Sequence, residues 1–208
     1  MATINGPKCK LCRREGMKLF LKGIRCETAK CGVSKRNYPP GERRWRRGKP
    51  SEYGLQLREK QKVRRMYGLM ERPFRSYYLR ASRTKENTGV AMLLLLERRL
   101  DNVLYRACVA ASRRQARMLI GHKHVMVNGK RVDRTGFTLS TGDEVTIVGD
   151  KALSLARTNA GEVGKARNVP EWLEVELEKG RIVVKQMPNR EDIPETIQEQ
   201  LIVELYGR

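Results

Sequence analysis

The sequence predicts an α+β fold in three parts: an N-terminal arm held by four cysteines, a helical domain, and a small helix–helix–strand module with an antiparallel sheet. Three observations predict this fold. Four of the five cysteines lie within residues 9–31. Apolar residues recur at helical spacing from residue 88 onward. After residue 124 they alternate with polar residues around an Asn-Gly pair, which is a hairpin signal.

The cysteines form two close pairs, Cys9-x2-Cys12 and Cys26-x4-Cys31. Two such pairs can place four thiolates around one ion, as in a closed structural zinc site. A four-iron, four-sulfur cluster (4Fe-4S) has the same ligand set, and four unrelated reduced thiols are a further alternative. We favour one zinc ion, because a closed shell of four thiolates is typical of structural zinc. We favour a structural role, because no partner acid, base or open coordination position accompanies the cysteines. Cys108 stands apart in an apolar context and is predicted to be an inert core thiol.

The net charge of +21 favours a polyanionic partner, with nucleic acid as the first candidate. Residues 1–50 carry 15 Lys and Arg against 3 acids, and residues 51–150 carry 20 against 10, whereas the remainder carries 9 against 10. No apolar run is long enough for a membrane helix, and the start does not resemble a signal peptide. A cytoplasmic, reducing location without a membrane is expected, which argues against disulfides.

Between the cysteines and the module, residues 34–54 read as an extended basic connector rich in Arg, Pro and Gly. Its aromatic residues Tyr38, Trp45 and Tyr53 could stack on bases, or the segment could be a solvated linker. Helices are predicted over 51–70 and over 72–82.

The module itself begins with an apolar helical face from residue 88 to about 110. The next helix opens with a capping box from Ser112 to Gln115 and ends at Gly121 as its C-cap. Met118 and the two residues after it are expected to be buried. A hairpin follows with a type I′ turn at Asn128 and Gly129.

Downstream of the hairpin the predicted elements are a strand within 141–148, a loop over 151–170, a second hairpin over 171–188 and a short amphipathic end. The predicted domains are therefore a four-cysteine arm at 1–45, a basic helical domain at 46–90, and an α+β domain at 91–189. The last contains the nucleic-acid-binding module at about 97–160. The C-terminal segment 190–208 is a candidate to complete the helical domain.

Several blocks of this sequence resemble the family of small-subunit ribosomal protein four (uS4), in its cysteine-bearing form. They are "GPKCKLCRREGMKLFLKG", "YPPG", "SEYGLQLREKQKVRRMYG", "LLERRLDN", "RRLDNVLYRACVAASRRQARMLIGHKHVMVNGKRV" and "REDIPETIQEQLIVELYGR". Together these blocks extend over nearly the whole chain.

The resemblance implies a structural constituent of the small ribosomal subunit, which is bound to the ribosome in the cytoplasm. It further implies binding of small-subunit ribosomal RNA early in assembly, near a helical junction of the 5′ domain, with effects on translational accuracy. It places the chain beside small-subunit protein five and near the entrance for messenger RNA, and some members regulate their own operon. In cysteine-bearing members the positions matching Cys9, Cys12, Cys26 and Cys31 bind metal.

The resemblance also carries predicted RNA contacts onto this chain. In the module they are Arg99, Arg106, Ser112, Arg113, Arg114, Gln115, Arg117, His122 and Asn128. In the connector they are Arg43, Arg44, Arg46 and Arg47. This chain departs from the family where a common His-Gly-His becomes His122-Lys123-His124, which puts the shape of that loop in doubt. The family's frequent Gln-His-Gly after "YPPG" is here Glu42, Arg43 and Arg44.

Two other functions were weighed against this one. The same small module occurs in pseudouridine synthases and some tRNA synthetases, but those enzymes carry a separate catalytic domain. This chain has no phosphate-binding or dinucleotide-binding glycine motif, and its two histidines lack an obvious nucleophile, so an enzyme is not expected. The remaining alternative is a free metal-containing RNA-binding regulator or RNA chaperone.

Overall fold

The structure is a computed structural model that describes residues 4, 6–41, 51–164, 167–194 and 196–207. It divides into two compact units. Unit 1 comprises Met1–Leu21, Arg25–Leu93 and Ile193–Arg208, and unit 2 comprises Lys22–Ile24 and Leu94–Asp192. The predicted parts 1–45 and 46–90 thus share one unit, whereas the three residues 22–24 join the other. No helix in the described residues is long and apolar enough to cross a membrane.

Unit 1 is helical. Its elements are α1 (Lys8–Glu15), η1 (Gly23–Cys26, whose first two residues belong to unit 2), α2 (Gly32–Lys35), α3 (Glu52–Met66), α4 (Glu71–Ala81), the first part of α5 (Thr88–Glu97) and α9 (Glu199–Gly207). The Ser51 hydroxyl caps α3 by accepting a hydrogen bond of 3.1 Å from the amide of Gly54. Helices near both predicted ranges, 51–70 and 72–82, are therefore present.

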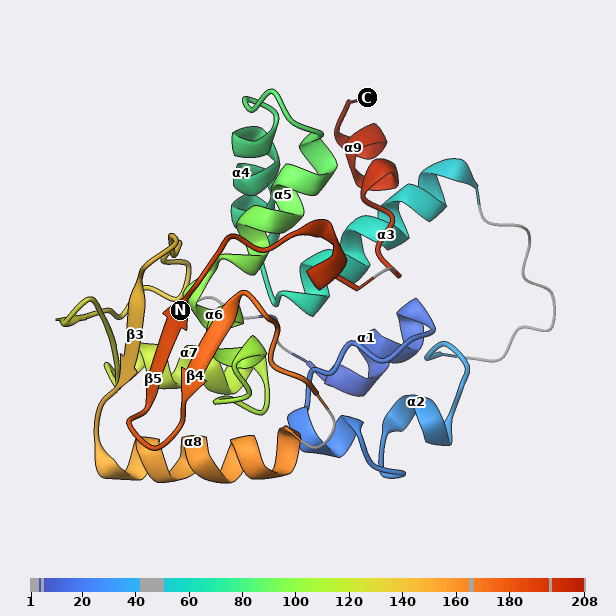
Figure 1. Cartoon of the computed structure of the whole chain (residues 1–208). Helices are drawn as coiled ribbons and strands as arrows, with labels where there is room; N and C mark the ends of the chain where they lie inside the picture. The colour runs from blue at the N-terminus through green and yellow to red at the C-terminus, as the bar shows by residue number, and fades with distance from the viewer. Residues whose placement is uncertain (1–3, 5, 42–50, 165–166, 195, 208) are drawn as a thin grey trace. The chain divides into compact units, whose positions relative to one another are not determined.

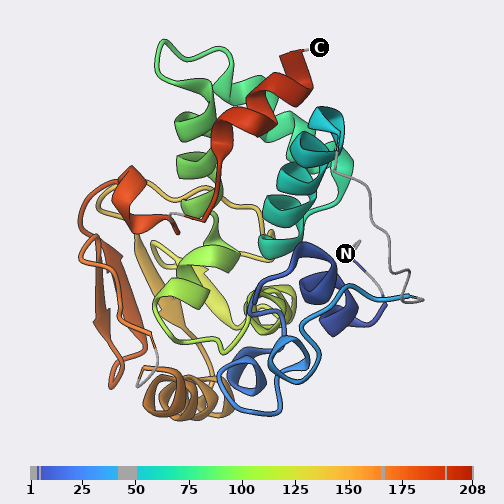
Figure 2. The same cartoon turned by 90° about the vertical axis from the view of Figure 1, so that its right-hand side faces the viewer.

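The C-terminal helix α9 packs against α3, and Figures 1 and 2 both show the two helices side by side. The amide of Gln56 donates to the Glu204 carboxylate at 3.0 Å. The hydroxyl of Tyr206 donates to the Glu71 carboxylate at 3.0 Å, and its ring stacks on Tyr78 with centroids 4.6 Å apart. The last residues of the chain are thus part of the packing of unit 1.

Unit 2 combines helices with an antiparallel sheet of five strands in the order β2-β1-β3-β5-β4. Its elements are the end of α5, α6 (Leu100–Arg106), α7 (Arg113–Gly121), β1 (Val125–Val127), β2 (Lys130–Arg131), β3 (Glu144–Ile147), α8 (Asp150–Val163), β4 (Leu173–Glu176), β5 (Arg181–Val184) and η2 (Arg190–Asp192). In Figure 1, α8 runs across the lower ends of β3, β5 and β4. The predicted helix–helix–strand–turn–strand–strand order is confirmed.

The core of unit 2 follows from the alternation in its strands. Val145 pairs with Val127 on one side and with Ile182 on the other, and all three side chains are buried. The hairpin turn has positive φ angles at both central residues, 49° at Asn128 and 75° at Gly129, as a type I′ turn requires. The predicted type I′ turn is therefore correct, and the two strands pair directly on either side of it.

The segment 151–170 contradicts the prediction of a loop, because most of it forms the helix α8. Its buried face consists of Ala152, Ala156, Asn159 and Val163, which recur every three to four residues. Asn159 donates from its amide to the carbonyl of Val109 at 2.9 Å. Small side chains on this face left too weak an apolar signal for a helix, although alanine has the highest helix propensity.

Three further expectations need correction. The apolar stretch from residue 88 is two helices, because Arg99 is extended and forms a β-bridge with Thr138. Gly121 is the last residue of α7, and the left-handed residue that ends the helix is Lys123, with φ 60°. Met118 is 51% exposed, since the buried stripe of α7 uses Ala116, Leu119 and Ile120.

Candidate nucleic-acid interface

Helix α7 presents the predicted basic residues from its first turn. The Ser112 hydroxyl accepts a hydrogen bond of 3.3 Å from the amide of Gln115, as an N-cap should. The Gln115 side chain accepts from the amide of Ala111 at 2.7 Å, one residue earlier than the expected capping box. Arg114 is exposed, and no described residue bonds to its side chain. The start of α7 therefore offers a positive charge next to helix amides, which suits an anion.

Two predicted contact residues, Arg99 and Arg117, share the carboxylate of Asp101. Arg99 donates to both oxygens of this carboxylate at 3.0 Å, and Arg117 donates from Nε to one of them at 2.7 Å. Asp101 and Arg99 are buried. A buried carboxylate needs partners of this kind, because desolvation of an isolated charge is costly. Contact of these two arginines with RNA stays a prediction.

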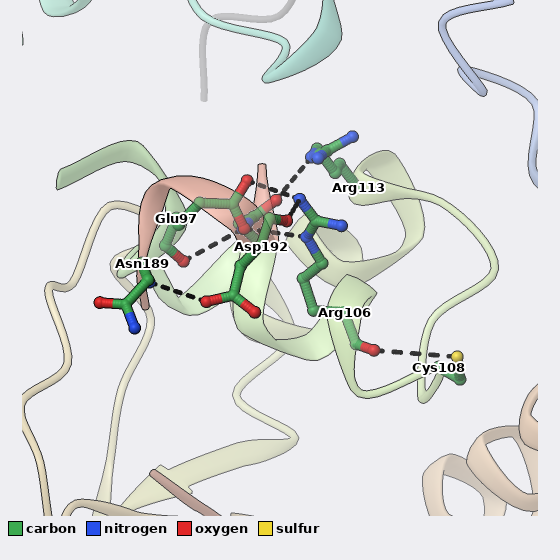
Figure 3. A network of polar contacts seen from close by, with 7 residues as sticks. Glu97, Arg106, Cys108, Arg113, Asn189 and Asp192 are labelled. Carbon is green, nitrogen blue, oxygen red and sulfur yellow. Dashed lines mark hydrogen bonds and ion pairs between the residues drawn. The ribbon is translucent and has the colours of Figure 1, made fainter. Parts of the chain in front are cut away.

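A second buried acid, Glu97, organises Arg106 and Arg113 (Figure 3). Arg106 donates to both oxygens of the Glu97 carboxylate, at 2.8 and 2.9 Å, and also to the carbonyl of Asp192 at 3.0 Å. The buried amide of Asn102 donates to Glu97 at 2.7 Å and accepts from Nε of Arg113 at 2.8 Å. A chain of hydrogen bonds therefore connects the guanidinium of Arg113 to a carboxylate in the core.

Backbone hydrogen bonds close the loop after α7 around Lys123. The amide of His124 donates to the carbonyl of Leu119 at 3.0 Å, and the amide of Lys123 donates to that of Ile120 at 2.9 Å. This pattern is a Schellman motif, in which Lys123 adopts the left-handed conformation that glycine favours. His122 is exposed beside it.

Asn128, another predicted RNA contact, braces its own turn. Its amide nitrogen donates to Asp143 at 2.8 Å, and its amide oxygen accepts from the backbone of Glu144 at 2.9 Å. The side chain thus fastens the β1–β2 turn to the start of β3, while the residue remains exposed. Contact between Asn128 and RNA is neither required nor contradicted by this geometry.

The sequence reasoning missed the buried polar residues that hold the arginines, namely Glu97, Asp101 and Asn102. A signal was available, because these residues interrupt an otherwise apolar helical stretch, where an unpaired acid would be costly. It also missed Tyr105, whose ring lies under two arginines, and one of those arginines, Arg167. No sequence pattern links residues 105 and 167.

The four cysteines are reduced, and three of them are buried. Burial raises the pKa of the Cys12 thiol, and the nearby Cys26, Cys9 and Cys31 raise it further against a backbone hydrogen bond from Leu19. Burial also acts to raise the pKa of Cys31. There, however, hydrogen bonds from the backbone of Ser34 and Val33 outweigh it and lower the pKa overall. The other three cysteines therefore affect the charge of the Cys12 thiol.

Within the described ranges, the cysteine segment has the donor atoms of a metal site but not a recognisable arrangement of them. Four thiols are the donor set of a structural zinc site or an iron–sulfur cluster, so the donor chemistry fits. Among the described residues, however, no group of three or more His, Cys, Asp or Glu side chains is arranged to hold a metal ion. The metal-stapled arm and its metal therefore stay a prediction.

Most of the predicted connector residues lie outside the part of the chain that the structure describes. Arg43, Arg44, Arg46 and Arg47, together with Trp45, fall within 42–50, outside the described residues. On either side, Tyr53 is 54% exposed, and the Tyr38 ring lies 4.6 Å from the guanidinium of Arg13.

The fold and this arginine-rich surface define a class, a basic α+β protein built to bind a polyanion. Residues 98–145 match the family description "S4 domain", and residues 3–97 match "Ribosomal protein S4/S9 N-terminal domain". Similar full-length proteins include the "Small ribosomal subunit protein uS4" of Geobacter sulfurreducens, at 52% identity. Those of Natranaerobius thermophilus and Syntrophobacter fumaroxidans are 51% and 50% identical. Each comparison covers 100% of both chains. The chain belongs to the uS4 family, which confirms the resemblance.

Proposed function

We propose that this chain is a structural, non-catalytic constituent of the small ribosomal subunit that binds the subunit's RNA. The observation that carries the proposal is identity of about half the residues to uS4 proteins over the entire length of both chains. The family does not favour the alternative of a free regulator or RNA chaperone. A cytoplasmic, ribosome-bound location follows from the same membership.

The RNA-binding surface is proposed to centre on the start of α7. Arg114 is exposed there, and Arg113 is fixed by Asn102 and Glu97 behind it. Arginine suits this task, because its planar fork can donate two parallel hydrogen bonds to one phosphate. Holding the fork in place before binding lowers the entropy lost when the phosphate arrives.

The cysteine segment is proposed to bind one zinc ion through Cys9, Cys12, Cys26 and Cys31, with a 4Fe-4S cluster as the alternative. Its support is the donor set, four thiols within residues 9–31, and the influence of three of them on the fourth, Cys12. When bound, zinc would stabilise the segment by cross-linking it and would take no part in a reaction. Elemental analysis with an absorption spectrum distinguishes the two, because a cluster contains iron and sulfide and absorbs visible light.

More specific roles also come from the resemblance. We propose that the chain binds early in assembly, nucleates the body of the subunit and affects translational accuracy. We also propose contact with small-subunit protein five and with messenger RNA near its entrance. The surface charge supports RNA contacts in general and does not select among these partners.

The test has two measurements. Tagged protein expressed in cells should sediment with small-subunit particles, and its absence from them would refute the proposal. In vitro, affinity for small-subunit RNA is measured over a series of salt concentrations. Arg114→Gln should weaken binding and reduce the slope of log K against log salt by about 0.7–0.9, the value for one phosphate contact. The exposed Arg131→Gln, on β2, is the matched control for loss of one charge in the same unit.

A further inference from the structure

The ring of Tyr105 lies against two guanidinium groups that come from distant parts of the chain. The guanidinium carbon of Arg113 is 4.2 Å from the ring centroid, and that of Arg167 is 4.5 Å from it. Both distances lie well within the range of a cation–π interaction. Tyr105 is only 6% exposed, so its ring is a largely desolvated platform, where such contacts are strongest.

Arg167 reaches this platform from the segment that follows α8, outside the residues 98–145 that match the S4 domain. Its own amide donates to the carbonyl of Val163 at 3.0 Å, which ties its backbone to the end of α8. Its side chain donates from Nη1 to the carbonyl of Ala111 at 3.5 Å. Ala111 directly precedes Ser112, the N-cap of α7, so Arg167 is held beside the start of the proposed RNA-binding helix.

The other arginine on the ring, Arg113, is the first residue of α7 and is fixed by Asn102. Because both guanidinium carbons lie so close to one centroid, they cannot be farther apart than the sum of the two distances. Two like charges at such a separation repel, and the repulsion falls when an anion binds between or beside them.

We propose that Arg167 is a further RNA-phosphate-binding residue, which acts together with Arg113 across the ring of Tyr105. This inference rests on the proposed function. It extends the binding surface beyond the S4 domain to a residue that follows α8. It also gives Tyr105 the role of a positioning residue, since the ring orients both guanidinium groups and does not itself have to touch RNA.

The experiment compares the affinity of the full-length wild type and variants for small-subunit RNA over a salt series. Arg167→Gln should weaken binding about tenfold or more at moderate salt, because a charge-assisted hydrogen bond is lost. It should also reduce the salt slope by about 0.7–0.9. The matched control is Arg157→Gln. Arg157 is an exposed arginine of α8 whose side chain donates to the carbonyl of Glu178, on the β4–β5 turn. This control should leave both quantities close to the wild type.

A double-mutant cycle tests whether the two arginines act together. If the two arginines share one phosphate site, the losses of binding free energy in Arg113→Gln and Arg167→Gln should be non-additive. If they contact separate phosphates independently, the two losses should add. Tyr105→Leu should reduce the coupling between them while leaving both charges present. Additive losses would overturn the joint action across the ring.

The outcomes separate the two proposals. Failure of the wild type to bind the RNA would refute the proposed function. If the wild type binds the RNA but Arg167→Gln has the same affinity and salt slope as Arg157→Gln, only the role of Arg167 is refuted. Fluorescence of Trp172, which is buried in unit 2, reports whether each variant is folded. If Arg167→Gln does not fold, Arg167→Lys replaces it. That variant should keep the salt slope and lose several-fold in affinity, and wild-type affinity would overturn the need for a guanidinium over the Tyr105 ring.

Discussion

Asp101 is the residue of unit 2 whose charge we expect to matter most for stability. Its carboxylate is 1% exposed and accepts three hydrogen bonds of 2.7–3.0 Å from Arg99 and Arg117. In Asp101→Asn the side chain keeps its size, but the buried guanidinium of Arg99 loses its counter-charge. Breaking a buried ion pair by neutralising one partner typically costs about 3–5 kcal/mol. Since asparagine retains one acceptor oxygen, we expect a loss of about 3 kcal/mol in the free energy of unfolding.

The assay follows unfolding of unit 2 in urea by the fluorescence of Trp172, which is fully buried there. A Trp45→Phe background makes Trp172 the only tryptophan, because the chain has two. The matched control is Asp133→Asn, an exposed aspartate of the same unit, which should change stability by no more than about 0.5 kcal/mol. A loss below about 1 kcal/mol in Asp101→Asn would refute the reasoning that this carboxylate neutralises buried arginine.

Three more predictions follow from particular residues. Lys123→Gly should stabilise unit 2 by about 1 kcal/mol, because Lys123 is left-handed, and an unchanged urea midpoint would contradict this. Burial acts to raise the pKa of Glu71, but hydrogen bonds from Lys60 and Tyr206 outweigh it and lower the pKa below its ordinary value. The stability that Glu71 contributes should therefore be present above the ordinary pKa of a glutamate and be lost as pH falls through the lowered pKa. Thermal unfolding of unit 1 should show the wild type losing its advantage over Glu71→Gln in acid, while the exposed Glu86→Gln shows no such trend. Cys26→Ser with Cys31→Ser should abolish metal binding and leave the Trp172 transition unchanged, and loss of that transition would contradict independent folding of unit 2.

The strands and turns of unit 2 could be predicted because their signals are local. Alternation fixes which residues of β1 and β3 face the core, and an Asn-Gly pair fixes the turn between β1 and β2. The helix α8 was missed, because its buried face uses alanine and asparagine and its neighbours lie some fifty residues away, as the bond from Asn159 to Val109 illustrates. The left-handed residue that follows α7 was misplaced for a similar reason, at Gly121 instead of Lys123. Gly121 is a strong local signal, but backbone hydrogen bonds to Leu119 and Ile120 decide that Lys123 is left-handed.

The arginines of the candidate interface were predictable as residues but not as a structure. Composition and resemblance indicate that arginines near α6 and α7 matter, and Ser112 correctly marks where α7 begins. Neither could predict that Arg117 shares a carboxylate with Arg99, because this pairing depends on the crossing of α6 and α7. Arg167 could not be found at all, since only the fold brings it to the ring of Tyr105.

A chain with a net charge of +21 nevertheless places two buried acids, Glu97 and Asp101, beside the basic helix α7. Surface acids at these positions would repel a phosphate backbone and cancel the attraction of the arginines. Buried acids act differently, because each is enclosed by the guanidinium groups that it holds. Glu97 fixes Arg106 directly and fixes Arg113 through Asn102. Long flexible side chains lose entropy when they become immobilised on binding, so arginines held in advance lose less of it when they meet RNA. The two buried acids therefore favour binding to a polyanion, although their charge has the same sign as the ligand.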